Sequence, residues 1–180
     1  MRALSTFFRL LMLTTALGSS SAWGGETISR EDQFKAAYLF NFLKFVDWPP
    51  SVANDVLTVC VIGADGVHDT LASGIESKRA GARRLTVRQL DTHASLDGCN
   101  VLYAEARDAP SDQRLASASQ LSILTVSDAS SFLLHGGMIE LFTDSNRLRF
   151  NINVDNTQRA GLRISSNLLQ LAAQVARDQK

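Results

Sequence analysis

Proline, cysteine and net charge are all scarce in this chain of 180 residues. With only three prolines and 45% hydrophobic residues, the composition excludes a chain that is disordered throughout. Its 18 basic side chains balance 18 acidic ones, whereas a nucleic-acid-binding domain needs a basic excess, so we expect no nucleic-acid partner. Two cysteines cannot build a metal cluster or a knottin scaffold. The length fits one globular domain of α/β or α+β class.

A long hydrophobic run is also missing, but a short one stands at the N-terminus. Arg2 precedes the apolar segment Leu10–Leu17, and Ser20-Ser21-Ala22 places small residues where a signal peptidase cleaves. The segment is shorter than the roughly 18 to 20 residues of a spanning helix. We predict a signal peptide over residues 1–22, cleaved after Ala22, and a single mature domain over residues 23–180. The alternatives are a retained anchor and a buried helix. Export through this signal predicts a location outside the cytoplasm.

The two cysteines both lie in or beside strand-like runs. Cys60 falls within Leu57–Ile62 and Cys99 opens the run that ends at Tyr103. In an oxidising compartment, neighbouring strands would bring the two residues to the roughly 5.5 Å Cα separation of a disulfide. We predict a Cys60–Cys99 bridge; the alternative is a pair of buried free thiols.

An aromatic helix is the most unusual element that the sequence predicts. Residues Ser29–Asp32 have the form of a capping box, and Pro49-Pro50 ends the pattern, so a helix should run to about Val46. Aromatic side chains recur along this segment with helical spacing and form a stripe on one side of the helix, and Trp48 lies just beyond its end. Such a stripe is either core or a surface kept for a partner. The candidate partner-binding residues are Tyr38, Phe42, Phe45 and Trp48.

After Trp48 the hydrophobic residues no longer recur with helical spacing and instead form short apolar runs. The predicted strands are Leu57–Ile62, Arg84–Leu90, Asn100–Tyr103, Leu121–Val126, Met138–Phe142 and Arg147–Asn153, the last two forming a hairpin. The predicted helices are Val67–Ile75, Ser111–Ser119 and about Ser165–Arg177. This alternation predicts an α/β three-layer sandwich with a mixed sheet of five to six strands flanked by helices.

Motifs for catalysis or cofactor binding are weak. The turn Gly63–Gly66 lacks the further residues of a dinucleotide or phosphate-binding loop. The histidines His68, His93 and His135 match no metal spacing, and no nucleophile motif is present. One basic cluster, Lys78-Arg79 with Arg83-Arg84, is typical of a solvated loop, with an anionic ligand as the alternative. We therefore expect a binding protein and no enzyme, with no metal or cofactor.

Several segments together resemble the YfiR family of bacterial periplasmic regulators. The similar segments, in the family's order, are Lys35–Pro49, Val59–Gly63, Gly98–Tyr103, Leu124–Asp128, Gly136–Ile139, Phe150–Asn153 and Ala160–Ser166 with Leu168-Leu169. Each is weak alone, but together they span nearly the whole mature chain.

The resemblance implies a Rossmann-like α/β sandwich and a regulator in place of an enzyme. Such proteins repress an inner-membrane diguanylate cyclase by binding its periplasmic sensor domain, which keeps cyclic di-GMP low and biofilm formation off. An outer-membrane lipoprotein that sequesters the repressor, and homodimers, are further implied. Cys60 and Cys99 match a family disulfide, whereas the second cysteine pair of some members is missing around Leu133–Phe142. The alternative function is a periplasmic small-molecule-binding module without a cyclase partner, with its pocket near Gly63 and Ser127-Asp128.

Overall fold

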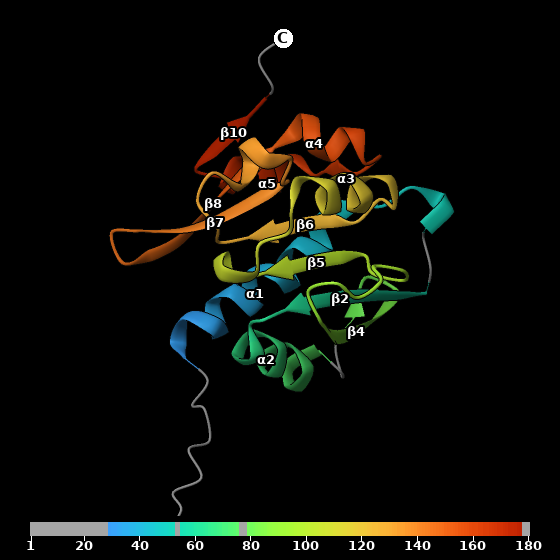
Figure 1. Ribbon diagram of the computed structural model, residues 1–180, viewed down its shortest axis with the longest axis horizontal. Coiled ribbons are helices and arrows are strands. Elements are labelled where there is room, and N and C mark those ends of the chain that lie inside the picture. The colour runs from blue at the N-terminus through green and yellow to red at the C-terminus, as the bar shows by residue number, and fades with distance from the viewer. Residues whose placement is uncertain (1–28, 53–54, 76–78, 178–180) are drawn as a thin grey trace, which may run out of the picture.

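The structure is a computed structural model that describes residues 29–52, 55–75 and 79–177 (Figure 1). The predicted signal peptide over residues 1–22 lies outside the described residues. No helix in the described ranges is both long enough and apolar enough to cross a membrane.

A central eight-stranded sheet organises the chain, with strand order β10-β8-β7-β6-β5-β2-β4-β3. Its six main strands are β2 (Val56–Ile62), β4 (Arg83–Leu90), β5 (Val101–Ala104), β6 (Leu124–Ser127), β7 (Ile139–Asp144) and β8 (Arg147–Asn153). The five strands from β4 to β7 are parallel, and β8 runs antiparallel to β7. The mixed α/β sandwich predicted from the sequence is therefore confirmed.

The strand count is higher than the predicted five to six because two short edge strands were not foreseen. β3 (Arg79–Ala80) pairs antiparallel with β4, and β10 (Gln174–Ala176) pairs parallel with β8. β10 forms inside the segment that was predicted as one long C-terminal helix. That helix is α5 (Ser166–Leu171) and ends early, because Ala173 N–H donates to the carbonyl of Phe150 and starts the pairing with β8. Long-range pairing here overrides a helical pattern.

Helices cover both faces of the sheet. Helix α1 (Arg30–Phe45) and helix α2 (Asp65–Ile75) pack together on the face that carries Val59 and Val61. Helix α3 (Asp112–Gln120) packs on the opposite face, which carries Cys60 and Ile62. In Figure 1, α3 lies in front of the central strands and α1 behind them. The result is the predicted three-layer arrangement.

The N-terminal helix begins and ends as its sequence predicts. The Ser29 hydroxyl accepts from Asp32 N–H and the Asp32 carboxylate accepts from Ser29 N–H, which completes the capping box. After α1 the chain turns extended as β1 (Val46–Asp47), which pairs with β9 (Arg163–Ile164) in a separate two-stranded sheet. Helix α4 (Val154–Arg159), which directly follows β8, was not predicted.

The β7–β8 hairpin is closed by a two-residue turn. Ser145 and Asn146 both have positive φ, 49° and 62°, as the two central residues of a type I′ turn require. The predicted hairpin connection over Thr143–Asn146 is thereby confirmed.

Candidate functional site

The predicted disulfide is present between Cys60 and Cys99. Their Cα atoms are 5.8 Å apart, and the sequence separation is 39 residues. Cys60 belongs to β2. Cys99 is the second-last residue of the connection between β4 and β5, residues 91–100, which contains turns and no helix. Because β5 and β4 lie on opposite sides of β2, that connection must cross β2. The disulfide therefore attaches a crossover without a helix to the strand that it crosses.

The structure places two of the four candidate partner-binding residues in the core, which is one of the two alternatives for the aromatic stripe. Phe42 has no exposed surface and Trp48 is 5% exposed. Phe42 packs against Phe150 with ring centroids 5.3 Å apart, and the Trp48 indole N–H donates to the Asn100 carbonyl at 3.3 Å. Tyr38 and Phe45 keep part of their rings exposed, so only these two of the four candidates present surface to a partner.

Other apolar side chains are exposed that the sequence pattern did not single out. Leu171 on α5 is 69% exposed, and Val175 on the edge strand β10 is 42% exposed. Helix α5 packs beside α1. Leu134, after β6, is 87% exposed on a separate element. Leu171 is the last residue of α5, whereas Val175 lies beyond the end of that helix, on the edge strand β10.

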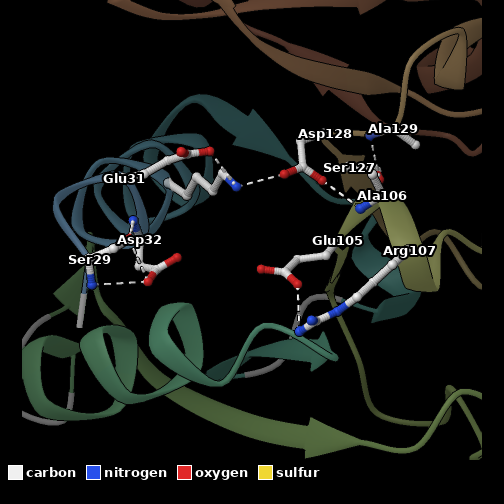
Figure 2. Close-up of polar contacts among 10 residues, drawn as sticks. Ser29, Glu31, Asp32, Glu105, Ala106, Arg107, Ser127, Asp128 and Ala129 are labelled. Carbon is white, nitrogen blue, oxygen red and sulfur yellow. Dashed lines mark hydrogen bonds and ion pairs between the residues drawn. The ribbon is translucent and has the colours of Figure 1, made fainter. Parts of the chain in front are cut away.

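A polar network lies at the carboxyl ends of the central strands. The Lys35 ammonium, 5% exposed, donates to Asp128 Oδ2 at 2.6 Å and to Glu31 Oε1 at 2.8 Å. Asp128 Oδ1 accepts from Ala106 N–H at 2.7 Å, and Figure 2 shows this carboxylate linking α1 to the segment after β5. In the same view Glu105 pairs with Arg107 at 2.9 Å. The network thus joins the first helix to two strands that lie far away in sequence.

Charge pairing sets the protonation of this network. Burial alone lowers the pKa of Lys35, but its hydrogen bonds to Asp128 and Glu31 outweigh burial and raise that pKa above the ordinary lysine value. Tyr103 is fully buried beside the pair. Burial, followed by the charge of Asp128, raises the pKa of the Tyr103 phenol above its usual range. At neutral pH the site therefore holds a charged lysine and a neutral tyrosine.

The Gly63–Gly66 turn is closed to a phosphate by the chain's own carboxylates. A Cβ on Gly63 would overlap the Asp108 carboxylate, and a Cβ on Gly66 would overlap the carboxylate of Asp32. Both side chains lie at the start of α2, where a nucleotide-binding fold would place an anion. Two negative charges in that position repel a phosphate. The absence of a side chain at Gly63 and Gly66 allows the carboxylates of Asp108 and Asp32 to pack closely against the backbone.

The polar groups at the strand ends pair mainly with one another. Asp128 is engaged by Lys35 and Ala106, and the Ser127 hydroxyl accepts from Ala129 N–H. Cavities lie elsewhere in the described part of the chain. One of about 190 Å³ lies between α1 and α2, beside Phe40 and Leu71, and one of about 460 Å³ lies at the amino ends of the strands, beside Thr58 and Cys99. A further one of about 390 Å³ lies beside His93 and Arg114. At the position near Gly63 and Asp128 that is the candidate small-molecule pocket, these polar groups already have partners within the protein.

The histidines do not come together. His68 contacts Asp69 and His135 contacts Asp112, each near the surface. Within the described ranges, no group of three or more metal-ligating side chains is found. The arrangement offers charged contacts and apolar surface for binding.

Comparison with known proteins matches this architecture. A solved structure described as a conserved domain protein from Vibrio cholerae O1 biovar El Tor is similar, with a TM-score of 0.53 and 13% identity. The match covers 81% of this chain and 60% of that chain, and at this identity it supports the fold alone. A family model described as YfiR/HmsC-like matches residues 32–173. Members of this family are periplasmic regulators in cyclic di-GMP signalling. The Cys60–Cys99 disulfide of this chain fits that oxidising compartment. The chain belongs to the YfiR/HmsC-like family.

Proposed function

We propose that this protein represses an inner-membrane diguanylate cyclase by binding the periplasmic sensor domain of the cyclase, which lowers cyclic di-GMP and biofilm formation. The observation that carries the proposal is the family match over residues 32–173, which spans nearly all the described residues. Cleavage of residues 1–22 delivers the chain to that compartment. Sequestration by an outer-membrane lipoprotein and formation of a homodimer belong to the same proposal.

The contact surface that we propose joins α1 to the C-terminal elements. Tyr38 and Phe45 are the partly exposed aromatic residues of α1, and the neighbouring α5 adds Leu171, which is 69% exposed. Tyrosine is among the common anchors of protein interfaces, and an exposed leucine beside it adds apolar contact area. Phe42 and Trp48 act indirectly in this scheme, because their packing fixes the position of α1 and of the chain just beyond it.

Repression requires a preference for one state of the cyclase. A bound protein shifts an equilibrium only by the difference between its affinities for the two states. The repressor must therefore bind the inactive arrangement of the sensor domain more tightly than the active one. A rigid helix face suits this task, because a preorganised surface loses little entropy on binding.

A calorimetric titration tests the proposal directly. The oxidised mature chain, Trp23 to Lys180, is titrated into the periplasmic domain of the candidate cyclase. We expect a dissociation constant in the micromolar range or tighter. Absence of both heat and co-elution would reject cyclase binding and would favour the small-molecule-binding module.

Two matched leucine substitutions locate the surface. Leu171→Ser should weaken cyclase binding by about fivefold, the effect of losing about 1 kcal/mol at an interface anchor. Leu134→Ser removes an even more exposed leucine from a different element and should leave the affinity unchanged. Equal effects of the two substitutions would contradict the assignment of this surface, even if the cyclase still binds.

A further inference from the structure

The outer edge of β4 is open along most of its length. On one side β4 pairs with β2 from Arg84 to Leu90. On the other side, β3 pairs only with Arg83 and Arg84. Figure 1 shows β4 beyond β2, at the opposite end of the sheet from β10. Within the described ranges, no strand pairs with this edge from residue 85 to residue 90.

Strand geometry identifies the backbone groups that face the open edge. Arg84 N–H donates to the Asp55 carbonyl at 2.8 Å, so the backbone of Arg84 points toward β2. In a parallel ladder every second residue bonds to the same neighbour, so Thr86 and Arg88 also point toward β2. The backbone groups of Val87 and Gln89 then point outward. They offer a polypeptide two donors and two acceptors in strand geometry.

This edge is also strongly basic. Arg79, Arg83, Arg84 and Arg88 lie on β3 and β4, in a chain whose formal net charge is zero. In the described part of the chain none of the four pairs with a carboxylate: Arg79 donates to the Ala82 carbonyl, and Arg88 donates to the Asp97 carbonyl and to Cys99 Sγ. The side chain of Arg84 is exposed, and strand alternation places it on the face of the sheet opposite the buried Leu85.

We propose that the outer edge of β4 binds an acidic segment of a partner polypeptide, which adds to the sheet as an extended strand next to Val87 and Gln89. The unpaired backbone groups supply the hydrogen bonds, and the arginines select for acidic side chains on the added strand. A second copy of this chain does not fit, because its own basic edge would meet an identical one. This edge is separate from the α1–α5 surface, so the inference does not depend on cyclase binding.

A nuclear magnetic resonance titration of the oxidised, ¹⁵N-labelled protein tests the proposal. The probe is a short peptide that alternates glutamate with valine, and the matched control peptide carries lysine in place of glutamate. We expect saturable shifts centred on the amides of Val87 and Gln89, lost at high salt, and weak or no shifts with the lysine peptide. Shifts centred elsewhere, or none at millimolar peptide, would overturn the proposal.

Three substitutions separate charge from backbone pairing. Arg84→Glu should weaken peptide binding by about fivefold to tenfold, since it replaces attractive cross-strand pairs by repulsive ones. Arg163→Glu makes the same charge change on β9 and should leave binding unaltered. Gln89→Pro removes an outward N–H, which an edge strand tolerates, and should abolish binding. Circular dichroism checks whether Gln89→Pro folds. If this variant is unfolded, the comparison of peptide binding by Arg84→Glu and by Arg163→Glu decides whether the basic edge of β4 is the binding site.

Two outcomes count against a bound strand. Undiminished binding by folded Gln89→Pro would show that the backbone is not paired. Binding of phosphatidylglycerol vesicles, with no response to the peptide, would assign the arginines to a membrane surface. Calorimetry of Arg84→Glu with the cyclase domain should give the wild-type affinity, so failure of the cyclase proposal and failure of this one are distinguishable.

Discussion

The two faces of the central sheet are buried by different means. The face that carries Val59, Val61 and Tyr103 is covered by α1, α2 and α5, and it contains the larger hydrophobic core. The opposite face has α3 and a smaller core around Ile62 and Leu102. Its other crossover has no helix, and the Cys60–Cys99 disulfide holds that crossover on β2. One face is therefore stabilised by packing, and the other by packing together with a covalent link.

The strongest test of the packed face is Phe42→Ala. Phe42 is fully buried between Tyr38 and Phe150, so the substitution removes a ring from the centre of the core. We expect a loss of about 4 kcal/mol in the free energy of unfolding, measured by urea denaturation of the oxidised protein. The matched substitution Phe34→Ala, at a 53% exposed ring on the same helix, should change it by about 0.5 kcal/mol or less. Similar losses from both would contradict the core position of Phe42.

The covalent link is tested by Cys60→Ala combined with Cys99→Ala. The bridge closes a loop of 39 residues, for which the chain-entropy model gives a loss of up to about 4 kcal/mol when the link is removed. Reducing agent should lower the stability of the wild type by a similar amount and leave the double variant unchanged. Because Phe42 lies on the other face, reduction should have the same effect in Phe42→Ala as in the wild type. A large departure from additivity would show that the two faces are coupled.

Sequence patterns predicted much of this difference but not all of it. The pairing of Cys60 with Cys99 follows from two strand-like runs and an oxidising compartment. The aromatic spacing of α1 predicts a helix, but periodicity alone does not say whether Phe42 faces a core or a partner. Burial depends on which strands pack beneath α1, and Phe150 lies more than 100 residues away in the chain.

The charged site could not be predicted for a similar reason. Lys35 is a charged residue on the predicted N-terminal helix, yet its ammonium is buried against Asp128, 93 residues further on. No local pattern connects the two residues. The end of α5 is a third case, because Val175 continues a helical spacing and the pairing of β10 with β8 places it on an edge strand instead.

The ion pair at the rim of the packed face gives a test that depends on pH. The pKa values of Lys35 and Tyr103 are both raised in the folded state, from ordinary values of 10.5 and 10.0. Above about pH 10 the unfolded chain loses these two protons while the folded protein retains them. Stability should therefore be constant with respect to both groups below pH 10 and should fall as the pH rises further. Urea denaturation at a series of pH values measures this slope.

Asp128→Asn tests the pair itself and should cost about 2 kcal/mol at neutral pH, as expected for a lost hydrogen bond between charged groups. It should also lower the pKa of Tyr103, because the charge of Asp128 raises that pKa. Ultraviolet titration of the Tyr103 phenol in the wild type and in Asp128→Asn measures this shift. Asp144→Asn, at an exposed ion pair with Arg149, serves as the control and should change stability by less than about 1 kcal/mol. An unshifted Tyr103 in Asp128→Asn would contradict the electrostatic coupling.

The smallest expected change in stability is for Trp48. Its indole N–H donates a hydrogen bond to the carbonyl of Asn100, the residue before β5. Trp48→Phe keeps an aromatic ring in the core and removes this donor, so we expect a loss of about 1 kcal/mol. Asn100 follows Cys99 directly, and its side-chain oxygen accepts from Thr58 N–H on β2. The indole therefore attaches the packed face to the residue beside the disulfide. If this connection matters, reduction of the bridge should destabilise Trp48→Phe more than the wild type, whereas equal effects would show that the faces are stabilised independently even at their closest approach.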